Sequence, residues 1–77
     1  MARKRLIDKA RELAELAKRE LGKPPYDYTE LVKLIVRNRK IHLTTAYQEV
    51  RSFIYAGFLE PDEETEGYRF SEEVLSE

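Results

Sequence analysis

The stretch IHLTTAYQEVRSFIYAGFL, residues 41–59, decides the fold of this chain. Its apolar residues recur four and three positions apart, which is the spacing of one buried helix face. These residues are Ala46, Val50, Phe53 and Ile54. Thr45 and Gln48 fit a capping box, in which two side chains bond free backbone N–H groups of the first helical turn. Because Gly57 tolerates the backbone of a sharp turn, the stretch predicts a helix over residues 44–57 that leads directly into a strand.

Two further helices are expected before this one. Residues 3–21 carry apolar side chains at helical spacing among charged ones, and Gly22 followed by Pro24 ends that helix. A second helix begins after the prolines, where Asp27 and Glu30 fit another capping box. The apolar stripe of this second helix consists of Leu31, Leu34 and Ile35. We expect the three helices to bury their apolar faces against one another.

The last part of the chain predicts a small hairpin. Residues 58–59 and 68–70 are typical of short strands, and the polar residues 60–67 between them are typical of a turn. Ser71, followed by two glutamates, indicates a final helical turn. A chain of 77 residues has room for one domain, 1–77. The predicted fold class is therefore mainly α with a small β-hairpin.

The order of these elements, with the spacing inside residues 41–59, resembles the winged helix-turn-helix DNA-binding superfamily, in particular its small archaeal transcription regulators. The positions of the family pattern are filled by Ile41, Ala46, Val50, Phe53, Gly57, Phe58 and Leu59. The resemblance implies three helices plus a two-stranded wing, with 3–21 as the first helix, 28–57 as the helix-turn-helix and 58–70 as the wing hairpin. Two features depart from the pattern. Arg39 stands where many members have an apolar residue, and the wing is acidic rather than basic.

Charge is distributed unevenly along the chain, although the formal net charge is only −1. Residues 1–23 carry eight Lys or Arg against four Asp or Glu, and residues 24–59 carry five against three. Residues 60–77 carry one basic residue against eight acidic ones. A basic front and an acidic back give the molecule a directed electric field. The chain has many Lys, Glu and Arg residues but only one Asn and one Gln. The composition of thermophile proteins differs from that of other proteins in the same direction.

The composition excludes most catalytic and metal sites. The chain has no Cys and a single histidine, His42, which excludes disulfides, thiolate zinc sites and histidine pairs. It has no glycine-rich phosphate loop and no serine elbow, and we expect neither an enzyme nor a cofactor. No apolar run approaches the roughly 20 residues of a membrane span, and no signal-peptide pattern follows the N-terminus. These features predict a soluble, cytoplasmic protein with no membrane partner.

The resemblance implies sequence-specific binding of double-stranded DNA by a transcription regulator, with the helix over 44–57 in the major groove. Gln48 is suited to adenine and Arg51 to guanine, because each side chain makes paired bonds to that base. The residues opposite the core stripe of this helix are Thr44, Thr45, Tyr47, Gln48, Arg51 and Tyr55. The basic residues at the turn before it, expected near phosphate, are Arg37, Arg39, Lys40 and His42.

Other interpretations stay open. The outward residues of the helix over 44–57 also fit an ordinary solvated face. The eight acids after Leu59 favour a winged-helix module that binds another protein. A non-catalytic, DNA-binding subunit of a replication or transcription assembly is a third possibility. Arg3, Lys4 and Arg5 either follow phosphate or a minor groove, or form a solubilising tail.

The first helix is apolar over about half of its circumference, which is wider than one packing seam needs. One interpretation places this whole face in the core of the chain. The other is a homodimer through the first helix, because small side chains allow a second copy to approach closely. The residues of that predicted dimer interface are Ile7, Ala10, Ala14, Ala17 and Leu21.

Overall fold

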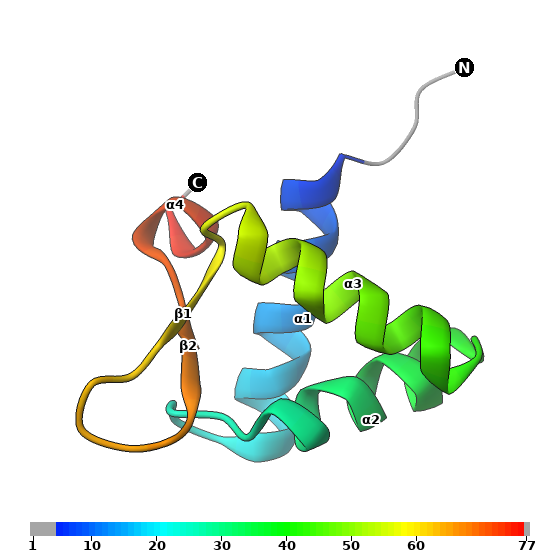
Figure 1. Cartoon of the computed structure of the whole chain (residues 1–77), viewed down its shortest axis with the longest axis horizontal. Helices are drawn as coiled ribbons and strands as arrows, with labels where there is room; N and C mark the ends of the chain where they lie inside the picture. Colours follow the sequence, from blue (N-terminus) through cyan, green and yellow to red (C-terminus); the bar gives the residue numbers. More distant parts are fainter. Residues whose placement is uncertain (1–4, 77) are drawn as a thin grey trace.

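Three long helices and a hairpin build the fold (Figure 1), and the computed structural model describes residues 5–76. In chain order the elements are α1 (Leu6–Leu21), α2 (Tyr28–Arg39), α3 (Leu43–Tyr55), β1 (Leu59–Pro61), β2 (Tyr68–Phe70) and α4 (Glu72–Leu75). The two strands pair in antiparallel fashion, with Leu59 opposite Phe70 and Pro61 opposite Tyr68. The predicted class, mainly α with a small β-hairpin, is confirmed.

The starts of two helices differ from the prediction. Arg5 has an extended backbone, so α1 begins at Leu6, and the predicted start at residue 3 lies outside the described residues. Helix α3 begins at Leu43 with His42 as its N-cap residue, so Thr45 lies inside the helix. Asp27 is the N-cap residue of α2 as predicted, but neither α2 nor α3 has a side-chain capping bond, so the bonds of both predicted capping boxes are wrong. The helices form without these bonds because packing of an apolar face supplies most of the stability of a helix in a protein.

The end of α3 follows the prediction. Gly57 has a φ of 80°, in the left-handed region that favours glycine. The N–H of Gly57 donates to the carbonyl of Ile54 at 3.1 Å, and the N–H of Phe58 donates to that of Phe53 at 2.9 Å. These bonds close the last helical turn and redirect the chain into β1. The predicted sharp turn at this glycine is therefore confirmed.

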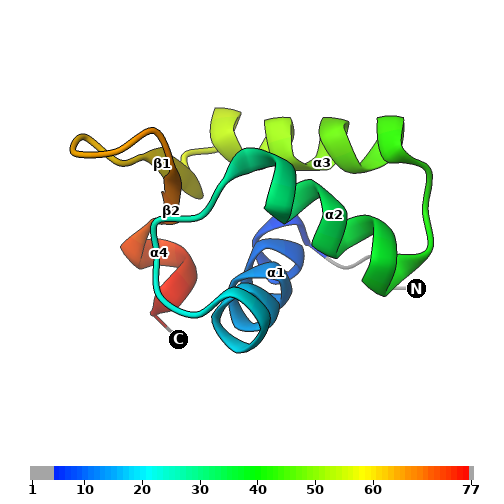
Figure 2. The same ribbon diagram turned by 90° about the horizontal axis from the view of Figure 1, so that it is seen from below.

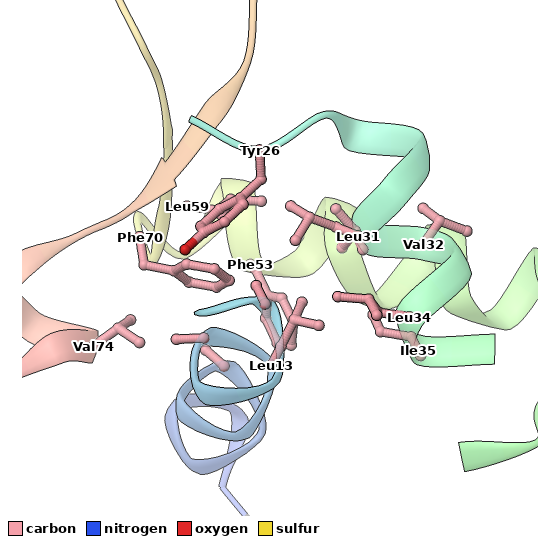
Figure 3. Close-up of a cluster of buried hydrophobic side chains, with 14 of the residues drawn as sticks. Leu13, Tyr26, Leu31, Val32, Leu34, Ile35, Phe53, Leu59, Phe70 and Val74 are labelled. Atoms are coloured by element: carbon pink, nitrogen blue, oxygen red, sulfur yellow. The ribbon is translucent and has the colours of Figure 1, made fainter. Parts of the chain in front are cut away.

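The core lies between α1, the α2–α3 pair and the hairpin (Figures 1 and 2). Figure 3 shows Leu13 of α1, Phe53 of α3 and Phe70 of β2 converging there. The largest fully buried side chains are Phe53, Leu31, Leu59, Val32 and Val50. Because they come from α2, α3 and β1, the helix pair and the hairpin share one core.

The segment before α2 joins the hairpin, which the sequence pattern did not predict. Tyr26 and Tyr68 exchange two backbone hydrogen bonds, each of 2.7 Å. Gly67 lies tightly against this segment, since a Cβ at that position would come within 2.7 Å of the Cβ of Pro25. The loop end of the two hairpin strands is therefore fixed to the segment before α2 by backbone bonds.

The alanines of α1 lie inside a single chain. Ala10 and Ala17 have no exposed surface, and Ala14 is 8% exposed. Helices α2, α3 and α4 all pack against α1, and the guanidinium Nε of Arg11 donates to the carbonyl of Val74 in α4 at 3.2 Å. The three alanines belong to the core and are not free to meet a second copy, which corrects the predicted interface. The homodimer itself stays a prediction.

Candidate nucleic-acid interface

Helix α3 packs one face into the core and leaves the other open to solvent. Ala46, Val50 and Phe53 have no exposed surface. Figure 2 shows α3 along one edge of the molecule, with α2 between it and α1. The side chains predicted to contact DNA from α3 are all exposed, and we call them the outward face: Thr44, Thr45, Tyr47, Gln48, Arg51 and Tyr55.

The single carboxylate of α3 is turned away from the outward face. Glu49 forms an ion pair and a hydrogen bond with Arg39 of α2. The Glu49 side chain is 12% exposed and that of Arg39 is 35% exposed. Arg39 neutralises Glu49 between the two helices. The Arg39 guanidinium is therefore paired within the protein, and the phosphate contact predicted for Arg39 stays a prediction.

The other predicted phosphate contacts surround the turn between α2 and α3. Arg37, Lys40 and His42 are exposed, and none of them forms an ion pair within residues 5–76. Lys40 has a left-handed backbone with a φ of 55°, and its N–H donates to the carbonyl of Val36 at 2.8 Å. We call Arg37, Lys40 and His42 the basic turn. It supplies positive charge beside the N-terminus of α3.

Three tyrosine rings gather between α3, the start of α2 and the hairpin. Tyr47 of α3 stacks on Tyr28 of α2, with ring centroids 5.7 Å apart and planes inclined by 26°. Tyr68 of β2 meets Tyr28 edge-on at 5.9 Å. We call these residues the tyrosine cluster, and it joins the outward face to the hairpin. The sequence pattern does not place Tyr28 and Tyr68 at the interface, and the presence of five tyrosines in the chain is the only sign of such a cluster.

The acidic loop of the hairpin lies at the opposite end of α3 from the basic turn (Figure 2). Glu63, Glu64 and Glu66 are exposed there. The loop is held by its own bonds, since Thr65 Oγ1 donates to Oδ2 of Asp62 at 3.0 Å. The interface is therefore polarised along α3, with cations at the start of the helix and carboxylates beyond its end.

A groove of about 1230 Å³ lies on another side of the molecule, between α1, α4 and the hairpin. Tyr26 lines it, and burial raises the pKa of the Tyr26 phenol above its ordinary value. The Tyr26 hydroxyl donates to the carbonyl of Gly22 at 2.9 Å. The groove lining mixes Lys18 and Lys23 with Glu15, so it does not favour one sign of charge, and it includes none of the outward face.

Comparisons with known proteins identify no relative of this chain. No family model, no curated protein and no solved structure matches it. In the part of the chain that the structure describes, no helix is long and apolar enough to cross a bilayer, and no His, Asp and Glu side chains group as metal ligands. The predicted contacts at Arg3 and Lys4 lie outside the described residues, whereas Arg5 is exposed at the start of α1.

Proposed function

We propose that this chain is a sequence-specific double-stranded DNA-binding protein, a transcription regulator, that inserts the outward face of α3 into the major groove. The observation that carries the proposal is the absence of a carboxylate from that face, since Arg39 holds Glu49 away from it. Carboxylates exposed on a groove-binding helix are repelled by the phosphates of DNA, because the duplex carries one negative charge per ≈ 1.7 Å of its axis. The order of helices and hairpin, which resembles a winged helix-turn-helix, supports the same function.

Two kinds of contact follow from this placement. Gln48 and Arg51 lie three positions apart on α3, and both are exposed. They read bases, because Gln bonds adenine and Arg bonds guanine through paired groups. Arg37, Lys40 and His42 bind phosphate, which positions the helix but carries no sequence information.

The proposal includes a homodimer that binds two half-sites about one helical turn apart. The core alanines of α1 do not form its interface. Ile7 and Leu21, the other predicted interface residues, are half-buried, whereas Leu6 and Leu75 are 37% and 63% exposed. We expect light scattering at high protein concentration to give twice the mass of one chain, and a monomer there would reject this part of the proposal.

A second candidate function is a winged-helix module that binds protein, either alone or as a non-catalytic subunit of a larger assembly. Two exposed side chains of α3 favour it, since Tyr55 is 83% exposed and Leu43 is 55% exposed. Tyrosine and apolar residues are typical of the centre of protein interfaces. The acidic loop of the hairpin would then meet a basic partner.

Binding of the full chain to a random-sequence duplex across a salt series separates these two functions. The logarithm of the association constant falls linearly with the logarithm of salt concentration, with a slope of about −0.9 per phosphate neutralised. For the basic turn and Arg51 we expect a slope of about −2 to −4 for each chain. No detectable binding at low salt would reject the DNA proposal and favour the protein-binding module.

The acidic loop is expected to oppose nonspecific DNA binding. Replacing Glu63, Glu64 and Glu66 by Ser removes exposed carboxylates and leaves the bond between Thr65 and Asp62 intact. We expect affinity for random DNA to rise about three- to tenfold at low salt, and the gain to shrink as salt screens the charges. Because the loop is exposed, the free energy of unfolding should change by less than about 0.5 kcal/mol.

The matched control carries the same type of substitution on another element. Glu15 and Glu20 are exposed on α1, outside α3 and the hairpin, and replacing both by Ser removes the same charge as a loop variant in which only Glu63 and Glu64 are replaced. A gain confined to the loop variant would mean that the position of the charge matters. A fall in affinity of the loop variant would instead indicate that the acids make a favourable contact with another subunit or a basic partner.

A further inference from the structure

The hydroxyls of the tyrosine cluster have no hydrogen-bond partner in the part of the chain that the structure describes. Tyr28, Tyr47 and Tyr68 contact one another through their rings, and within residues 5–76 none of their hydroxyls forms a hydrogen bond. The hydroxyl of Tyr26, by contrast, donates to the carbonyl of Gly22 at 2.9 Å. A tyrosine combines an apolar ring with a polar tip, and the tip normally finds a partner. In the cluster, ring packing holds three side chains in place, and their three hydroxyl groups stay available as hydrogen-bond donors to a ligand.

These donors flank the helix that we assign to the major groove. Tyr47 belongs to the outward face of α3 and is 39% exposed, and Tyr28 and Tyr68 are half-buried beside it. Helix α2 begins at Tyr28, and Figure 2 shows the start of this helix below α3 and beside the hairpin. A helix lying in a major groove has a sugar–phosphate backbone along each side. The cluster therefore lies where one of these backbones passes α3 on the hairpin side.

Two cations of the elements that carry Tyr28 and Tyr68 are paired. Arg69 of β2 forms an ion pair with Glu60 at 3.9 Å, and Lys33 of α2 forms one with Glu30 at 4.0 Å. The loop beyond the strands is acidic. A phosphate that approaches here meets these neutral donors beside Arg51, which lies one helical turn from Tyr47 and forms no ion pair within residues 5–76. Tyrosine hydroxyls are among the groups that bind phosphate oxygens in protein–DNA complexes.

We propose that Tyr28, Tyr47 and Tyr68 form a phosphate-binding contact made of neutral donors on the hairpin side of α3. The inference rests on the proposed DNA-binding function and deepens it. The stacked rings hold the hydroxyls in position, so that the phosphate oxygens of the duplex accept hydrogen bonds from them. This contact replaces the phosphate contacts that a basic wing would otherwise make. The acidic loop beyond it repels the DNA backbone, so the contact with the duplex ends there.

Removing single hydroxyls tests this contact. Tyr28→Phe and Tyr68→Phe keep the ring contacts and delete one donor each, so we expect the melting temperature to stay unchanged. Each variant should bind a random-sequence duplex about three- to tenfold more weakly. The slope of the salt dependence should stay the same, because a neutral donor releases no counterion when it binds phosphate.

Tyr26→Phe is the matched control, because its hydroxyl is bonded inside the protein. It should lower the melting temperature and leave DNA affinity unchanged. If the Tyr28 and Tyr68 variants bind like the unsubstituted chain, or if their salt slope becomes shallower, the neutral contact is wrong while the DNA-binding function stands. If the unsubstituted chain does not bind DNA at low salt, the proposed function fails and this inference fails with it.

Discussion

Replacing Ala10 by Glu is expected to unfold the chain, with a loss of about 4 kcal/mol or more in the free energy of unfolding. Ala10 has no exposed surface, so the new carboxylate would have to leave water for the apolar core or push α1 away from its neighbours. A domain of 77 residues has a total stability of about 4–12 kcal/mol, so a loss of this size removes about a third of it or more and unfolds the chain at the lower end of that range. Urea unfolding followed by circular dichroism measures the effect.

The control for Ala10→Glu is Lys18→Ala, on the exposed side of the same helix. This change should shift the free energy of unfolding by less than about 0.5 kcal/mol. The two interpretations of α1 give opposite results. If Ala10→Glu were folded and monomeric while the unsubstituted chain were dimeric, the alanine would lie at a dimer interface and its place in the core of one chain would be wrong.

The buried face of α3 could be predicted from the sequence because its signals are local. Ala46, Val50 and Phe53 recur at helical spacing, and each has no exposed surface in the structure. Gly57 adopts the left-handed backbone that ends the helix. In both cases the residues that carry the signal lie within a few positions of one another. Local backbone preferences and side-chain periodicity are then enough to predict the element.

The role of α1 could not be settled from periodicity, because a helical pattern tells which residues are apolar but not how many neighbours cover them. Part of the cover comes from α4, which spans only Glu72–Leu75. Its Val74 is 3% exposed, and Arg11 bonds its carbonyl. A segment of four residues with two glutamates has no periodicity from which such a packing role could be inferred.

The surroundings of the candidate interface depend on how separate elements align. Arg39 and Glu49 lie ten positions apart and meet across the α2–α3 pair. Tyr28 and Tyr68 meet only because the hairpin folds back onto the start of α2. Such pairs are set by the register between elements, which the pattern within each element does not contain. The sequence therefore predicted the outward face of α3 but neither the neutralised cation nor the tyrosine cluster beside it.

Replacing Arg51 by Ala is expected to weaken binding to the preferred DNA site by about 1–3 kcal/mol and to relax base preference at one position. Arg51 is the only cation of α3, and its side chain is exposed on the outward face. In the major groove its guanidinium makes paired hydrogen bonds with guanine, and an alanine at this position makes neither of them. Selection of sites from a random duplex pool measures the preference, and titration of the selected site measures the affinity.

Lys40→Ala is the matched comparison, because it removes a cation from the basic turn and not from the outward face. It should weaken all sequences about equally and make the salt slope shallower by about 1. The contrast between the two variants separates base reading from phosphate binding. If Arg51→Ala lowered affinity without changing base preference, Arg51 would be a phosphate contact and α3 would not read the groove. If neither variant altered affinity, α3 would not face DNA, and its exposed Tyr55 and Leu43 would favour a protein partner.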